Sequence, residues 1–89
     1  MSDRTDKIEK LLTNALAPES LQVIDDSHEH AGHGGYHESG SHFSVTVVSQ
    51  SFHSLDTLSR HRIIYDALGD MMQKEIHALK IAAYSPDEI

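Results

Sequence analysis

The sequence contains no cysteine and only two prolines among its 89 residues. Without cysteine the chain can form no disulfide, carries no thiolate nucleophile and cannot hold zinc or an iron–sulfur centre through sulfur ligands of its own. Any bound metal must therefore be held by histidines, by carboxylates or by the sulfur atoms of a partner protein.

Long apolar runs are lacking as well. No stretch approaches the roughly 20 residues that span a bilayer, so we expect a soluble chain without a membrane segment. Residues 1–10 are charged, and they show neither the apolar core of a signal peptide nor the arginine-rich, acid-poor composition of a transit peptide. The expected location is therefore cytoplasmic.

Basic residues are scarce: seven Lys and Arg stand against 14 Asp and Glu, for a formal net charge of −7. This charge repels phosphate backbones, which argues against general nucleic-acid binding and points toward protein partners. A search for catalytic motifs finds no phosphate-binding loop, no Gly-x-Ser-x-Gly elbow and no His-Glu-x-x-His pair, so we expect a protein that is not an enzyme.

A chain this short forms one domain, residues 1–89, because its buried surface cannot be divided between two cores. Apolar residues at helical spacing predict a first helix that Ser2 caps and Pro18 ends; they are Ile8, Leu11, Leu12, Ala15 and Leu16. Residues 21–25 and the alternating stretch 43–47 are typical of two strands of a hairpin.

The second half predicts a turn with a short helical piece over 52–59, a helix over 60–72, a strand over 76–84 and a helical stub over 85–88. A strand, a crossover helix and a further strand usually pair in parallel. We therefore expect an α+β fold of order αββααβ, with a three-stranded mixed sheet and helices packed on one face.

Histidine is the outlier of the composition, with eight residues. Five of them fall within fifteen positions: His28, His30, His33, His37 and His42. Residues 26–41 also hold four glycines and no aliphatic side chain larger than alanine, which predicts an exposed, mobile loop. Its imidazoles could converge on a zinc, copper, nickel or iron ion. The alternative is that they are solvated loop residues or a metal scavenger without a specific role.

His77 begins the last predicted strand, on the side that Leu79 and Ile81 share. A histidine in such a place is commonly structural, hydrogen-bonded and partly buried. However, a parallel strand that starts here lies near one end of the hairpin, where the 26–41 loop could fold over it. His77 and a loop histidine would then form half of a metal site.

Arg60, His61 and Arg62 form the only basic cluster and open the predicted second helix. Positive charge at a helix N-terminus opposes the helix dipole, which suggests contact with a phosphate or an acidic partner. An ion pair with Asp56 or Asp66 is the competing explanation.

Several blocks of the sequence resemble the BolA family in order and spacing, over about Ile8 to Ser85. The blocks are Asp25–His30, Ser41–Val45, Phe52, Arg60–Tyr65 and Ile76–Leu79. The resemblance implies a fold similar to the type II KH domain and a partnership with a monothiol glutaredoxin. In that partnership the two proteins share a [2Fe–2S] cluster for iron–sulfur trafficking, assembly or iron sensing.

The resemblance also implies the ligands. The glutaredoxin and a glutathione supply thiolates, and the BolA-like chain, a monomer when alone, supplies its strand-start histidine and one loop residue. The first corresponds to His77. The second corresponds to His30, with His33 next and His28, His37 and His42 as weaker candidates.

The family is also associated with DNA-binding transcription regulation in stress response and cell morphology, through the 60–65 helix region or the KH-like surface. This chain has no Gly-x-x-Gly clamp of the KH kind between its predicted helices, and its acidity argues against tight DNA binding. DNA-binding regulation therefore stands as the alternative function.

Overall fold

The computed structural model describes residues 3–26 and 42–89. The elements follow the order that the sequence predicts: α1 (Asp3–Leu16), β1 (Ser20–Asp25), β2 (His42–Val48), α2 (Thr57–Leu68), α3 (Met71–Lys74) and β3 (Ala78–Tyr84), with short 3-10 helices η2 (Gln50–Phe52) and η3 (Pro86–Glu88). The predicted cap Ser2 and almost all of the 26–41 loop lie outside the described residues.

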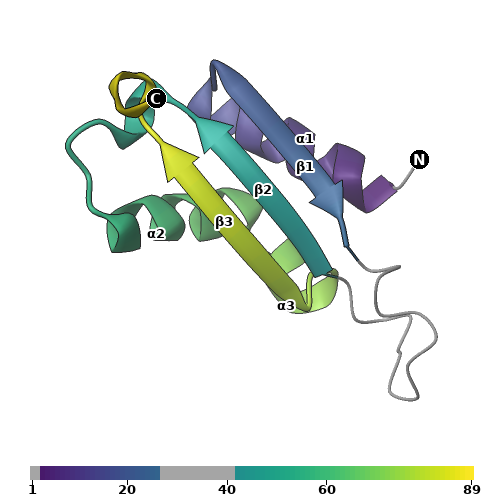
Figure 1. Cartoon of the computed structure of the whole chain (residues 1–89). Coiled ribbons are helices and arrows are strands. Elements are labelled where there is room, and N and C mark those ends of the chain that lie inside the picture. The colour runs from purple at the N-terminus through teal and green to yellow at the C-terminus, as the bar shows by residue number, and fades with distance from the viewer. Residues whose placement is uncertain (1–2, 27–41) are drawn as a thin grey trace.

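The three strands form one mixed sheet in the order β1-β2-β3. β1 pairs with β2 antiparallel and β2 pairs with β3 parallel, as predicted. The helices lie on one face of this sheet, with β2 in its centre (Figure 1). The predicted α+β architecture is therefore confirmed.

The core lies between the sheet and the helices, and it uses the apolar positions of the predicted patterns. Its buried members are Ile8, Leu12, Leu16, Phe43, Val45, Val47, Phe52, Ile64, Leu68, Met71 and Ile76. The alternation along β2 sends Phe43, Val45 and Val47 into the core. Ala15, which the helical pattern includes in the apolar stripe, is exposed instead.

The predicted helix over 60–72 is wrong at both ends. α2 begins three residues earlier because the Asp56 carboxylate accepts a hydrogen bond from the Ser59 backbone N–H at 2.8 Å, which caps the helix. It ends at Leu68 because Gly69 adopts a φ of +54°, a conformation that breaks the helical path. Met71 therefore belongs to the separate helix α3, although it still faces the core.

Candidate functional site

The two histidine-bearing regions meet at one end of the sheet. β1 ends there, and both β2 and β3 begin there, because β2 is antiparallel to β1 and parallel to β3. In this register His42 lies opposite Ala78, the residue that follows His77. The arrangement of strands alone therefore brings the first residues of β2 and β3 together, far apart though they are in the sequence.

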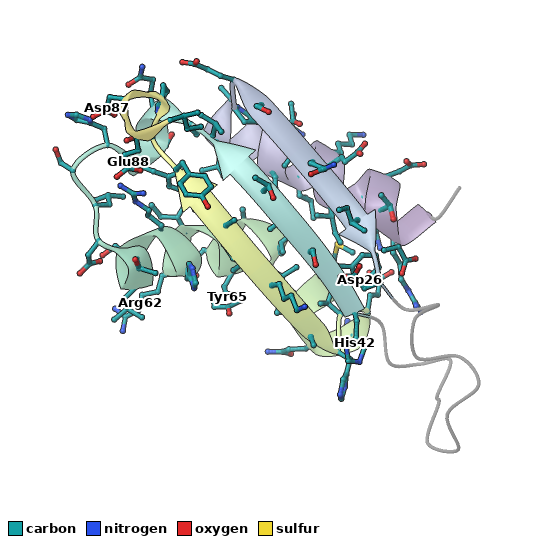
Figure 2. All side chains as sticks on the ribbon, in the orientation of Figure 1. Asp26, His42, Arg62, Tyr65, Asp87 and Glu88 are labelled. Carbon is teal, nitrogen blue, oxygen red and sulfur yellow. The ribbon has the colours of Figure 1, made fainter. Side chains whose placement is uncertain are left out.

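Two hydrogen bonds, one between backbone groups and one between side chains, join β2 to the residue after β1 at this end of the sheet. The Asp26 backbone N–H donates to the His42 carbonyl at 2.8 Å, which continues the β1–β2 pairing one residue further. The Ser44 hydroxyl donates to the Asp26 carboxylate at 2.5 Å. Figure 2 shows Asp26 and His42 close together at this end of the sheet. The backbone position of His42 is thus set by β1 as well as by β3.

The imidazole rings of His42 and His77 are neighbours. Their centroids lie 5.2 Å apart, and their planes are tilted by 41°. His42 is half-buried, whereas His77 is exposed and precedes β3 instead of lying within it. The expectation that His77 is part of the strand and partly buried beside Leu79 and Ile81 is therefore wrong. The chain turns at His77, so the side chain lies outside the packed layer.

This spacing suits two ligands of one ion. A metal–nitrogen bond is about 2.1 Å and an imidazole centre lies about 1.1 Å behind its nitrogen, so two rings on one tetrahedral ion have centres roughly 5.2 Å apart. Over residues 3–26 and 42–89, however, no three His, Cys, Asp or Glu side chains gather as a metal site. The pair can supply two ligands, and the others must come from water or a partner.

The remaining histidines of the predicted cluster are His28, His30, His33 and His37, and they lie outside the described residues. Their assignment as ligands stays a prediction. His42, which the sequence ranks below His30 and His33, is the member of the cluster that the structure places beside His77. The sequence could have indicated this pair, because His42 and His77 each lie at the start of a predicted strand and the two strands are expected to pair in parallel.

The basic cluster divides into residues with different roles. Arg60 is only 9% exposed, and its guanidinium is occupied within the fold. It donates to the backbone carbonyls of Leu55 at 2.9 Å and Ala83 at 3.0 Å. It also binds both carboxylate oxygens of Glu88, at 2.6 and 2.9 Å. Arg60 thus ties α2 to the end of β3 and to η3, and its exposure does not suit contact with a nucleic acid.

The ion-pair partner of Arg60 is Glu88. The sequence offers Asp56 or Asp66 as a partner for the basic cluster as a whole, and within that cluster the charge of Arg62 acts on Asp56. Hydrogen bonds from the Arg60 guanidinium lower the pKa of the Glu88 carboxyl to about 2, and the Ser85 backbone N–H contributes to this shift. The same pair raises the pKa of Arg60. The sequence does not identify Glu88 as the partner of Arg60, because the two residues are 28 positions apart and meet only when β3 has paired with β2.

The other two members of the cluster lie nearer the surface. Arg62 is exposed on α2, as is Tyr65 on the same helix, which is 40% exposed (Figure 2). His61 is half-buried. Hydrogen bonds from Ser59 lower the pKa of the Asp56 carboxyl, and the charge of Arg62 lowers it further. Arg62 is therefore the member of the cluster most accessible to a partner.

Comparison with known proteins supplies the context for this site. A family model described as BolA-like protein matches residues 12–88. The DNA-binding transcriptional regulator BolA of Vibrio cholerae is 43% identical over 83 residues, which covers 93% of this chain and 76% of that protein. SufE-like protein 1 of Arabidopsis thaliana is 36% identical over 94 residues; all of this chain matches, but it spans only 25% of that relative.

Solved structures agree with this similarity. The BolA domain of SufE1 from Arabidopsis thaliana superposes with a TM-score of 0.86 at 39% identity, covering 100% of this chain and 99% of that one. The solution structure of BolA1 from Mus musculus gives a TM-score of 0.83 at 34% identity, covering 99% of this chain and 69% of that one. Among the described residues, no helix has the length and apolar character to cross a membrane.

Proposed function

The chain belongs to the family of BolA-like proteins, and we propose that it acts as an adaptor that binds a monothiol glutaredoxin and shares a [2Fe–2S] cluster with it. The glutaredoxin and a glutathione supply thiolates, and this chain supplies two imidazoles. Its role is to accept, hold and pass on the cluster in iron–sulfur trafficking, assembly or iron sensing. In this proposal the chain catalyses no reaction of its own.

The observation that carries the proposal is the pair of imidazole rings at the end of the sheet where β2 and β3 begin. His42 and His77 lie 5.2 Å apart, a spacing that suits two nitrogen ligands on one tetrahedral iron. The chain has no cysteine, so a partner must supply the sulfur, and this chain offers imidazole nitrogen at this end of the sheet. Histidine ligands on one iron also raise the reduction potential, as they do in Rieske centres.

The two imidazoles differ in how firmly they are assigned. His77 is exposed at a fixed point of the fold, directly before β3. We propose it as the first ligand, whichever histidine provides the second. The second ligand is a choice between His42, which lies beside it, and the loop residues His30 and His33. His42 has the support of geometry, whereas His30 and His33 have the support of the family resemblance.

The decisive experiment is an absorption and circular dichroism spectrum of the chain mixed with a cluster-loaded monothiol glutaredoxin. We expect wild type to change the spectrum of the partner's cluster and His77→Ala to abolish that change while the far-ultraviolet spectrum stays native. His53→Ala is the matched control, because His53 is an exposed histidine that instead lies 3.5 Å from Asp87. A normal shared-cluster spectrum in His77→Ala would refute the proposal.

The same assay separates the candidates for the second ligand. If His42 is the ligand, His42→Ala behaves like His77→Ala, and the double change His30→Ala with His33→Ala retains the shared spectrum. If the loop supplies the ligand, the two results are reversed. Because His42 is half-buried in β2, its variant also needs a thermal melt to show that the sheet is intact.

DNA binding remains a second candidate function because the Vibrio cholerae relative is named a DNA-binding transcriptional regulator. Arg62 is the exposed residue of the basic cluster that could contact a phosphate. The net charge of −7 opposes such binding. If the chain regulates transcription, Arg62→Ala should weaken a gel shift at physiological salt and reduce its dependence on salt, without lowering thermal stability.

A further inference from the structure

We propose that His42 and His77 also bind a single divalent ion of the zinc class when no partner is present. Such an ion would compete with a partner's cluster for the same two imidazoles. The ion site itself depends only on the geometry of this chain, whereas the competition rests on the proposed cluster function. Zinc supply would then regulate how much of the protein is free to accept a cluster.

The pair is preorganised because each histidine stands on a fixed backbone. His42 is held between β1 and β3, through the Asp26 N–H bond to its carbonyl and the pairing with Ala78. His77 follows Ile76, which is buried and donates its N–H to the Met71 carbonyl at 2.8 Å. An ion that binds here has only side-chain rotations to restrict, so little conformational entropy is lost.

The chemistry of the pair also favours a divalent ion. Neutral imidazole is a good ligand for zinc, nickel and copper, and a centroid distance of 5.2 Å is compatible with two rings on one tetrahedral ion. The nearby Asp26 carboxylate accepts from Ser44 and serves as a structural acceptor. In the absence of further protein ligands, water fills the remaining positions of the coordination shell, and the ion can exchange.

No other described histidine has the same arrangement. His53 is an exposed residue beside Asp87, at 3.5 Å, and His61 is half-buried on α2. These two residues serve as internal references in the same sample. A general affinity of zinc for exposed histidines would affect His53, whereas a two-ligand site affects only His42 and His77.

The test is a titration of the full chain with ZnCl₂, followed by the ring proton and nitrogen resonances of the histidines in NMR spectra. To remove competing ligands, His28, His30, His33 and His37 are replaced by asparagine in the protein used. We expect the His42 and His77 signals to move together and to saturate at one zinc per chain. The His53 and His61 signals should stay in place.

Calorimetry on the same background gives the affinity. We expect His42→Ala and His77→Ala each to weaken zinc binding at least about tenfold, equivalent to about 1.4 kcal/mol, and His53→Ala to leave it unchanged. Independent movement of the two ring signals, or an affinity that survives His77→Ala, would overturn the ion site. The ring signals of the unsubstituted pair decide the question even if an alanine variant unfolds.

A second measurement separates this inference from the proposed function. Zinc is added to the chain before it is mixed with cluster-loaded glutaredoxin, and glutaredoxin with zinc alone serves as the control for damage to the cluster. If zinc binds the pair but the shared spectrum still forms, the ion site stands and the competition is refuted. If the shared spectrum forms and zinc leaves both ring signals unmoved, the proposed function stands and the ion site is refuted.

Discussion

Ser49 connects several segments of the fold through one buried residue, and we predict that Ser49→Ala is strongly destabilising. The side chain is 0% exposed. Its hydroxyl donates to the Leu16 carbonyl at 2.8 Å and accepts from the Ser51 N–H at 3.1 Å. Its backbone N–H donates to the Tyr84 carbonyl at 2.9 Å. Alanine keeps the backbone bond but removes both bonds of the side chain.

The size of the effect follows from what each lost bond leaves behind. The Leu16 carbonyl at the end of α1 loses its donor at a buried position, which costs about 1–3 kcal/mol. The loss of the hydroxyl that caps η2 costs about 1 kcal/mol more. The sum is about 3 kcal/mol, which lowers the Tm of a chain of this size by roughly 12–24 °C.

Urea unfolding followed by circular dichroism measures the difference in free energy of unfolding between wild type and Ser49→Ala. An unchanged m-value would show that the two proteins expose the same amount of surface on unfolding. Ser51→Ala is the matched control, because Ser51 is exposed and contributes its backbone N–H, which alanine retains. We expect the control to lie within about 0.5 kcal/mol of wild type. If Ser49→Ala also lies in that range, the buried hydroxyl does not stabilise the junction as argued.

Three further predictions concern other points of the backbone and one ion pair. Ala17 has a φ of +44°, and glycine at this position should relieve about 1–2 kcal/mol of backbone strain. This gain exceeds the entropy that glycine adds to the unfolded chain, so Ala17→Gly should raise the free energy of unfolding by about 0.5 kcal/mol, as thermal melts can test. Gly69→Ala should cost about 1–3 kcal/mol in urea unfolding, because a residue with a Cβ rarely adopts a φ of +54° with a ψ of −126°. Lack of space is not the cause, since an added Cβ would meet only the Asp66 carbonyl oxygen, at 3.9 Å. The pKa of Glu88 is lower in the folded chain, at about 2, so its ionised form stabilises the fold above its ordinary pKa near 4.5 and this contribution disappears as the pH falls toward 2. Tm measured across that range should therefore fall less steeply in Glu88→Gln than in wild type, and equal slopes would refute the role of the pair with Arg60.

Local patterns predicted most of the fold. The helical spacing of Ile8 and Leu12 and the alternation of Phe43, Val45 and Val47 identified both the elements and the faces that they bury. The crossover rule then supplied the parallel pairing of β2 and β3. These features depend on neighbours in the sequence or on general topology, so they can be read without coordinates.

Features that depend on a single backbone angle or on a distant partner could not be predicted in the same way. The break at Gly69 interrupts an apolar pattern that continues to Met71, so periodicity extended the helix too far. Sequence proximity favours nearby acidic residues as partners of the basic cluster, whereas Glu88 reaches Arg60 from η3, which follows the last strand. The proximity of His42 and His77 follows from the predicted topology, but the distance between their rings does not.

The parallel pairing of β2 and β3 also affects when the histidine pair can form during folding. A parallel pair needs a long crossover, and non-local contacts of this kind form slowly because the chain must close a large loop first. An incompletely folded chain therefore contains all its histidines but not the pair, since His42 and His77 meet only once β3 has docked. The proximity of the two rings therefore reports that β2 and β3 have paired, and refolding experiments that follow the rings should detect them as neighbours only in chains where this pairing has formed.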